Sequence, residues 1–350
     1  MGVYDVQIKS ECCGVCSSDV HTISGGWSSD VPVPLCVGHE VVGKVEKVGS
    51  KVTDFKVGDR AGVGAQVWSC LVCKLCKENN ENYCPHQVDT YGAPYPTEKE
   101  AAEFGVTNGK ELGLDGTKSQ GGYSSRIRAH QRFVFPIPDA LSSVDAAPLM
   151  CAGLTVYSPL VRNRVGQEGV KNVAIAGVGG LGHYAVQFAK ALGAHVTVLT
   201  HSPSKEADVR EMGADDVVLT NKEGWESDYA MKFDFILSTI DDSRGQTLPA
   251  FTSTLRVGGT YHSVGLPDKE VPVKFQMFAG NMSAISGSHI GSKAEVIEML
   301  KLVVDKKIKS WTMPIPISPE GCSEAVTRVH DNNNVKYRIV LTSFDKAFGA

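Results

Sequence analysis

The stretch from residue 173 to residue 192 constrains the fold more than any other part of this sequence. A short apolar run at 173–176 leads directly into the pattern G-x-G-x-x-G at 177–182. Apolar residues then recur at helical spacing, and a second apolar run follows at 196–199. Because parallel neighbouring strands need a crossover connection, this order of strand, glycine turn, helix and strand predicts a parallel sheet with helices packed on it.

The spacing of apolar residues and turn signals along the chain changes near residue 151. Before it, short strand-like runs such as 3–9 and 41–48 are separated by turn signals, among them Gly14. After it, strand candidates at 217–219, 233–237 and 261–266 are separated by helix-like or turn segments, and the tail from residue 311 contains a further strand-like run at 337–341. We therefore predict an α/β protein with a β-rich domain over residues 1–150, followed by a parallel-sheet domain.

The composition excludes several classes of partner. The 35 Lys and Arg residues against 39 Asp and Glu give a net charge of −4, which leaves no basic excess to neutralise nucleic-acid phosphates. No apolar run reaches the roughly 18 residues of a membrane span. Charged residues at positions 5, 9 and 11 interrupt the apolar core that a signal peptide would need. We expect a cytoplasmic protein that acts on a small molecule, with no nucleic-acid or membrane partner.

Four of the ten cysteines form the closely spaced pattern C-x2-C-x2-C-x7-C, at Cys70, Cys73, Cys76 and Cys84. Four thiolates can surround one zinc or iron ion tetrahedrally and leave no open position, so we predict a structural metal site. One alternative is a set of free or redox-active cysteines. Another is a nucleic-acid-binding zinc ribbon, which the nearby glutamates and the overall acidity disfavour.

A second candidate metal site combines residues that are far apart in the sequence. His39 lies in the pattern G-H-E-x2-G-x5-G, Cys16 lies upstream, and Cys151 lies more than one hundred residues downstream. Two thiolates and one imidazole would balance the charge of a zinc ion and leave a fourth position for water or substrate, as catalytic sites do. The spacing does not show that the three residues converge, and Cys151 as an ordinary buried cysteine is the alternative.

The glycine motif predicts a dinucleotide site, because it places backbone N–H groups at a helix N-terminus where a pyrophosphate binds. An NAD site would carry an acidic residue about 20 positions further on. The sequence instead reads T-H-S-P-S-K at 200–205, which favours NADP(H), although a solvated surface loop would look the same. The candidate cofactor residues are Gly177, Gly179, Gly180, Leu181, Gly182, Thr200, His201, Ser202 and Lys205.

Taken together, these motifs resemble the zinc-dependent medium-chain dehydrogenases, and most closely the cinnamyl alcohol dehydrogenase group with its fungal NADP-dependent relatives. The matching segments run through almost the whole chain and are 14–19, 38–49, the four-cysteine loop, 120–123, 151–157, 177–183, 202–205 and 337–338. The resemblance implies a GroES-like β catalytic domain over residues 1–150 that holds one catalytic and one structural zinc. It further implies a Rossmann doubly wound NADP-binding domain over 151–291, a C-terminal segment over 292–350 that completes the catalytic domain, and a homodimer.

The resemblance also assigns roles around the catalytic zinc. Cys16, His39 and Cys151 would be its ligands, and Glu40 would be an alternate ligand that helps exchange the bound water. Asp19 would orient His39, since such a partner fixes the tautomer of a metal-binding histidine and raises its basicity.

Ser18 and His21 match the proton relay of the same family, and Thr155 belongs to the segment that matches near its NADP site. The alternatives are a turn hydroxyl for Ser18 and a surface residue for His21. Three loop aromatics, Trp27, Tyr91 and Tyr95, either line an aromatic-friendly pocket or simply pack.

The activity implied is reversible oxidation of a primary alcohol, aromatic or of medium chain length, to an aldehyde with NADP, running as aldehyde reduction in the cell. One alternative is an NAD-dependent polyol dehydrogenase of the same superfamily. A more distant alternative is a noncatalytic, zinc-stabilised nucleotide binder.

Two departures from the family pattern stand out. Relatives generally carry an additional stretch before the position of Cys16, so we expect either a truncated start or a domain that opens differently. The polar, glycine-punctuated stretch at 94–120 is longer than the usual connection. We expect it to be a long excursion loop that borders the substrate entrance.

Overall fold

The computed structural model describes residues 1–28, 30–31, 33–241 and 248–349. It divides into two compact units, one formed by Met1–Leu154 together with Ile290–Ala350 and the other by Thr155–His289. The sequence predicts domains over 1–150, 151–291 and 292–350, and these boundaries lie within a few residues of the boundaries between the two units. The roles assigned to the three domains stay a prediction. Each unit is described by itself below.

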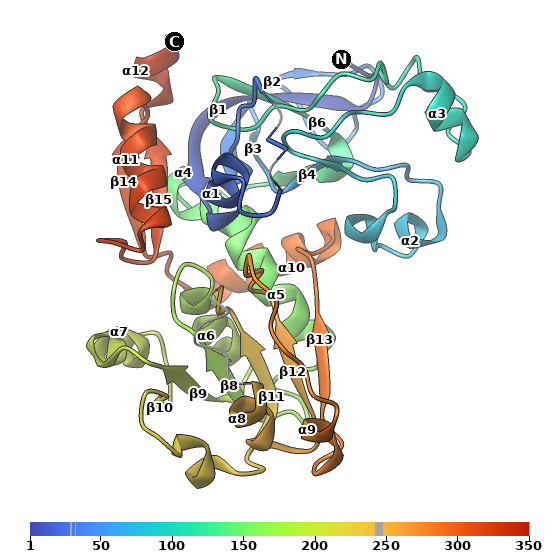
Figure 1. Cartoon of the computed structure of the whole chain (residues 1–350). Coiled ribbons are helices and arrows are strands. Elements are labelled where there is room, and N and C mark those ends of the chain that lie inside the picture. Colours follow the sequence, from blue (N-terminus) through green and yellow to red (C-terminus); the bar gives the residue numbers. More distant parts are fainter. Residues whose placement is uncertain (29, 32, 242–247, 350) are drawn as a thin grey trace. The chain divides into compact units, whose positions relative to one another are not determined.

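The first unit is built on a seven-stranded sheet that contains strands from both the N-terminal and the C-terminal part of the chain (Figure 1). Its strands are β1 (Asp5–Val15), β2 (Val41–Val48), β3 (Arg60–Val63), β6 (Arg126–His130), β7 (Val134–Pro136), β14 (Thr312–Pro316) and β15 (Arg338–Thr342). The order is β14-β15-β1-β2-β3-β7, with β6 also paired to β1. Cys13 of β1 pairs with Leu341 of β15, so the C-terminal segment completes the sheet of the N-terminal part.

The first strand is longer than the sequence predicts. Gly14 lies inside β1 rather than in a turn, and β1 continues for six residues beyond the predicted run at 3–9. The reason is that residues 12–15 are all buried, so the alternation of apolar and polar residues on which a strand prediction depends is lost there.

The remaining elements of this unit are mostly short. They are β4 (Gln66–Trp68), β5 (Val88–Asp89), α1 (Ser17–Ser24), α2 (Lys74–Lys77), α3 (Glu98–Glu103), α4 (Ser143–Ala146), α10 (Lys293–Lys306), α11 (Pro319–His330) and α12 (Phe344–Phe348), with 3₁₀ turns η1 (Glu81–Tyr83), η2 (Gln131–Phe133) and η3 (Ala147–Met150). Helix α10 begins with a capping box in which the Ser292 hydroxyl accepts a hydrogen bond from the Glu295 N–H, and the Glu295 carboxylate accepts one from the Ser292 N–H.

The stretch at 94–120 consists mostly of turns, as expected of a long excursion loop, but it also contains one short helix, α3, which was not predicted. A capping box between Thr97 and Glu100 starts α3, and an isolated bridge pairs Pro94 with Lys118. Its apolar residues are buried in the same core as the four-cysteine loop, and the Phe104 ring stacks on His86 with centroids 3.8 Å apart. The excursion therefore packs on the four-cysteine loop, because it contains apolar residues that the polar composition concealed. A border on the substrate entrance stays a prediction.

The second unit is a six-stranded parallel sheet, as predicted. Its strands are β8 (Asn172–Ala176), β9 (His195–Thr200), β10 (Asp216–Leu219), β11 (Phe233–Ser238), β12 (Leu255–Ser263) and β13 (Ala284–Gly287), in the order β10-β9-β8-β11-β12-β13. Its helices are α5 (Ala152–Arg162), which the unit boundary crosses, α6 (Gly182–Ala191), α7 (Glu206–Glu211), α8 (Leu248–Ser253) and α9 (Gln276–Ala279), with the 3₁₀ turns η4 (Pro203–Lys205) and η5 (Trp225–Tyr229). The strand predicted at 261–266 begins earlier, at Leu255, because its first half contains Gly258 and Gly259, which interrupt the apolar pattern. The chain order reverses between β8 and β11, which is the Rossmann arrangement and the place where such sheets bind ligands.

Within the described residues, no single helix is long and apolar enough to cross a membrane. One bent pair, Ser143–Met150 with Ala152–Arg162, meets the length and composition criteria together, a test that buried core helices also pass.

Candidate metal, cofactor and relay sites

The structure brings together the three residues predicted to bind the catalytic zinc. Cys16 directly follows β1 and is the N-cap of α1, His39 lies just before β2, and Cys151 lies just before α5. Their ligand atoms and a carboxylate oxygen of Glu40 all lie within 4.8 Å of one another, and all four residues are buried. His39 Nε2 is 3.2 Å from Cys151 Sγ, close to the roughly 3.6 Å expected when both bind one tetrahedral zinc ion.

A single buried carboxylate, Asp19, holds this ligand set in place. Its Oδ1 lies 2.9 Å from His39 Nδ1 and accepts a hydrogen bond from the Gly38 N–H, while its Oδ2 accepts one from the Cys16 N–H. Gly38 has φ +102°, and a Cβ there would lie 2.5 Å from the Tyr123 ring, so the turn before His39 requires glycine. Because Asp19 occupies Nδ1, the other ring nitrogen of His39 faces the two cysteines, as a ligand must.

Glu40 is paired with a residue to which the sequence analysis gave no role. The Arg338 guanidinium on β15 donates a hydrogen bond to Glu40 Oε1, and both side chains are almost completely buried. The other carboxylate oxygen, Oε2, is buried without a hydrogen-bond partner among the described residues. An unpaired buried oxygen among cysteine and histidine ligands fits the alternate-ligand role expected for Glu40. Arg338 could not be linked to Glu40 from the sequence, since 298 positions separate them.

The titration of these groups suits metal binding. Hydrogen bonds from Cys151 and His39 hold the pKa of the Cys16 thiol well below its usual range. Burial opposes the charged form of His39, but the Asp19 carboxylate outweighs burial and raises the pKa of the imidazole. Burial raises the pKa of Glu40 to about 7 even though Arg338 counteracts it. The hydrogen bond with Cys16, together with burial, raises the pKa of Cys151 well above its usual range, so the pair holds one thiolate. Two sulfurs, one imidazole and one carboxylate form a donor set that fits zinc.

The predicted relay residues lie on one helix next to this ligand set. Ser18 and His21 are both on α1, three positions apart and therefore on the same face. Ser18 Oγ is 3.7 Å from Cys16 Sγ. The His21 ring stacks on Trp27, with centroids 4.8 Å apart, and Trp27 is 44% exposed, so this end of the helix reaches solvent.

The other two loop aromatics differ from each other. The Tyr91 ring lies against His39, with centroids 5.8 Å apart, so it borders the ligand set. Tyr95 is buried in the core under the Arg128 guanidinium, 4.7 Å from its ring centroid. Tyr95 belongs to the hydrophobic core of this unit, which agrees with the alternative that it simply packs.

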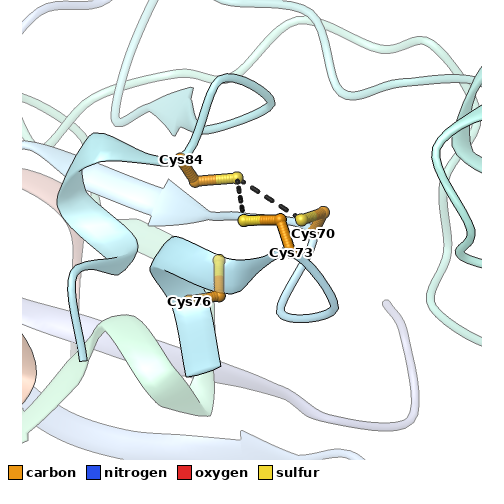
Figure 2. A group of neighbouring side chains, drawn as sticks. All are labelled: Cys70, Cys73, Cys76 and Cys84. Carbon is orange, nitrogen blue, oxygen red and sulfur yellow. Dashed lines mark hydrogen bonds between the residues drawn. The ribbon is translucent and has the colours of Figure 1, made fainter. Parts of the chain in front are cut away.

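The four-cysteine site is compact and closed, as the spacing predicts (Figure 2). Cys84 Sγ lies 3.5 Å from Cys70 Sγ and 3.9 Å from Cys73 Sγ. Four thiolates around one zinc ion would be about 3.8 Å apart, since the edge of a tetrahedron is 1.63 times the Zn–S distance. Hydrogen bonding with Cys84 lowers the pKa of Cys76 to about 5, and the same interaction raises the pKa of Cys84 well above its usual range, so this pair of sulfurs holds one thiolate.

The glycine motif forms the turn between β8 and α6, as predicted. Gly177 has φ +84°, a left-handed conformation that favours glycine, and Gly182 begins the helix. Thr239 at the end of β11 donates a hydrogen bond from Oγ1 to the Gly177 carbonyl, 2.9 Å away. Gly179, Gly180 and Leu181 complete the turn, so the motif places its backbone at the N-terminus of α6.

Lys205 lies beside this turn, although 23 positions of sequence separate it from Gly182. Its Nζ donates a hydrogen bond to the Val178 carbonyl, 2.6 Å away, and burial lowers the pKa of the ammonium group. The Ser202 hydroxyl lies 3.1 Å from that of Ser204. Lys205 thus lies next to the glycine turn, and two hydroxyls follow β9; contact of Lys205 and Ser202 with a phosphate stays a prediction.

The remaining predicted cofactor residues are less closely tied to this cluster. Thr200 ends β9, and its hydroxyl accepts a hydrogen bond from the Ser202 N–H, whereas His201 is exposed. Thr155 is buried on α5, and its hydroxyl has no hydrogen-bond partner among the described residues. Their contact with a cofactor stays a prediction.

Comparison with known protein families matches two parts of the chain. Residues 2–139 match the alcohol dehydrogenase GroES-like domain, and residues 180–305 match the zinc-binding dehydrogenase family.

Individual relatives are similar over nearly the whole chain. The NADP-dependent alcohol dehydrogenase 6 of Saccharomyces cerevisiae is 41% identical over 350 residues, which cover 99% of this chain and 90% of that protein. Among solved structures, a cinnamyl alcohol dehydrogenase from Sorghum bicolor matches with a TM-score of 0.86 and 33% identity, covering 98% of this chain and 91% of that one. A cinnamyl alcohol dehydrogenase from Helicobacter pylori, solved with NADP(H), matches with a TM-score of 0.83 and 31% identity, covering 97% and 91%.

Proposed function

Because the chain belongs to the zinc-dependent medium-chain alcohol dehydrogenases of the cinnamyl alcohol dehydrogenase group, we propose that it interconverts primary alcohols and aldehydes with NADP(H) as the hydride carrier. The observation that carries this proposal is the buried group of Cys16, His39, Glu40 and Cys151. Three of these residues suffice to hold a zinc ion, which leaves the fourth coordination position open for a substrate. A noncatalytic nucleotide binder would not need such an open metal site. Aromatic and medium-chain aldehydes are the substrates that we propose.

The protein's own residues would prepare the reacting oxygen. Zinc held by Cys16, His39 and Cys151 supplies Lewis-acid chemistry to an alcohol or aldehyde oxygen. Asp19 keeps His39 in the tautomer that binds metal. Ser18 Oγ would accept the proton of the alcohol as it gives up its own hydroxyl proton, and the His21 imidazole would release that proton to solvent.

The cofactor preference follows from the residues beside the glycine turn. NADP supplies the hydride acceptor when bound. The turn at 177–182 would hold its pyrophosphate, while Lys205 and Ser202 would hold the 2′-phosphate. An NAD-dependent polyol dehydrogenase would need a carboxylate at this position, and the sequence has none between 200 and 205.

We further propose a homodimer in the cytoplasm. Strand β13 is at the edge of the six-stranded sheet, and all four of its residues are exposed, including Ile285. An uncovered edge strand is a natural pairing site, and twofold dimers are the commonest oligomers. Light scattering after size exclusion should therefore give twice the chain mass, and a monomer would refute this part.

The test of the activity is a screen of aromatic and aliphatic aldehydes for oxidation of NADPH, with NADH in parallel and metal analysis of the same sample. We expect aldehyde-dependent consumption of NADPH, a clear preference over NADH, and two zinc ions per chain, one for each ligand group. Oxidation of polyols with NAD instead would favour the polyol dehydrogenase. One zinc ion and no turnover would favour the nucleotide binder.

A further inference from the structure

A tight turn at the end of α1 folds the chain back toward the helix that carries the predicted relay residues. Gly25 directly follows α1 and has φ +73°, a left-handed conformation that favours glycine. The Gly25 N–H donates a hydrogen bond to the Thr22 carbonyl, and the Gly26 N–H donates one to the His21 carbonyl, 2.9 Å away. These two bonds form a Schellman motif, which closes the helix and reverses the direction of the chain.

The residue that this turn returns to the helix is Trp27. Its ring stacks on the His21 imidazole, with centroids 4.8 Å apart and ring planes only 13° from parallel. Trp27 is exposed and His21 is half-buried, so the pair lies at the surface of this unit. One of the loop aromatics whose role the sequence leaves open is thus in direct contact with the predicted proton relay.

The stack favours the form of His21 that carries a proton. In the proposed relay, the imidazole takes up one proton at a ring nitrogen and then gives it to water, so it passes through the imidazolium cation and returns to the neutral ring. The face of an aromatic ring attracts a cation, and tryptophan does so more strongly than tyrosine or phenylalanine. The same contact restricts rotation of the imidazole about its side-chain bonds, which keeps its two nitrogens in one orientation.

We propose that Trp27 is a positioning residue of the proton relay, which holds the His21 ring and stabilises its imidazolium form. The inference rests on the proposed function, because it assumes that His21 carries the proton of the alcohol to solvent. A tryptophan that lined a substrate pocket would act on the substrate instead, and a tryptophan that only packed would act on the stability of the fold. These three roles predict different results when Trp27 and His21 are replaced separately and together.

The first test is a double-mutant cycle of Trp27→Ala and His21→Ala in the full-length protein, measured as the oxidation of benzyl alcohol with saturating NADP. We expect Trp27→Ala to lower kcat about two- to fivefold, the range of an exposed cation–π contact, at an unchanged KM for the alcohol and an unchanged zinc content. In the His21→Ala background, Trp27→Ala should have no further effect, because the group on which it acts is gone. Trp27→Phe retains an aromatic face and should keep most of the rate.

Ile23→Ala is the matched control for this cycle. Ile23 is an exposed apolar residue on the same helix, two positions from His21 and therefore on another face. Its replacement should change neither kcat nor KM. Trp27→Leu retains apolar bulk without an aromatic face, so it should lower kcat as Trp27→Ala does even if the alanine variant is less stable.

The second test observes the His21 ring without catalysis. In the proton NMR spectrum of histidine-labelled protein, the His21 signal is identified by its loss in His21→Ala. We expect the indole ring current to displace this signal upfield, and we expect the displacement to disappear in Trp27→Ala and in Trp27→Leu while the Tm stays unchanged.

The outcomes separate this inference from the proposed function. An undisplaced His21 signal, or a Trp27→Ala effect of equal size with and without His21, would overturn this inference alone, and a raised KM in both backgrounds would place Trp27 at the substrate. If His21→Ala itself left kcat unchanged, the relay assignment and this inference would fall together. Failure of the unaltered protein to oxidise any primary alcohol would overturn the proposed function as well.

Discussion

Replacing Asp19 by asparagine tests how much of the catalytic metal site depends on one carboxylate. In the structure, Asp19 Oδ1 serves both the Gly38 N–H and His39, and Oδ2 serves the Cys16 N–H. Alanine would leave four groups without this hydrogen-bond partner, namely the Gly38 N–H, His39, the Cys16 N–H and the Tyr123 hydroxyl, at about 1–3 kcal/mol each, which is comparable with the entire stability of many domains. Asparagine at this position would keep the volume and one acceptor oxygen, so Asp19→Asn is the informative change.

The cost of Asp19→Asn follows from which oxygen is lost. The remaining amide oxygen would still accept hydrogen bonds from His39 and the Gly38 N–H. The new NH₂ group would face the Cys16 N–H, and because both groups are donors they could not form a hydrogen bond. One unsatisfied buried donor destabilises the fold by about 1–3 kcal/mol. Loss of the charged partner of a metal-binding histidine lowers metal affinity by about 10–100-fold.

The assay is zinc content under increasing chelator, measured together with thermal unfolding. We expect Asp19→Asn to lose one zinc ion at about 10–100-fold lower chelator while the four-cysteine ion stays bound, with a lowered Tm. Asp139→Asn, a change at an exposed aspartate of the same unit, is the matched control and should behave like the unaltered protein. Equal zinc retention and an equal Tm for the Asp19 variant would refute the reasoning.

Three other changes separate the remaining roles. Ser18→Ala should lower kcat about 100-fold with unchanged zinc content, because general-base assistance is lost; unaffected turnover would remove the relay assignment. Lys205→Ala should weaken NADPH about 10–100-fold and NADH little, since a charged hydrogen bond is worth about 1.5–3 kcal/mol; equal losses would contradict the 2′-phosphate site. Cys73→Ser should lower the Tm and release the structural ion, so lost activity at an unchanged Tm would argue against a structural role.

The sequence predicts the local chemistry of the sites well. The four cysteines lie within fifteen residues, and the glycine turn joins adjacent elements, so short-range chain geometry alone brings their groups together. The choice of NADP(H) also follows from residues close to one another, at 200–205. The packing of the stretch at 94–120 was not predictable, because a few buried apolar residues such as Leu114 are hidden in a polar composition.

Motif spacing and composition therefore determined the residue types of the two metal sites, the glycine turn of the cofactor site and the α/β class of this protein. Each of these depends on the chemistry of single residues or on neighbours in the chain. Only the tertiary structure decided that Arg338 neutralises Glu40 across 298 positions, and that His262 lies between Ser286 and Ser288. The physical reason is strand register: which side chains face each other across a sheet is fixed by pairing and burial over the whole domain, and a one-residue shift would turn each of them to the opposite face.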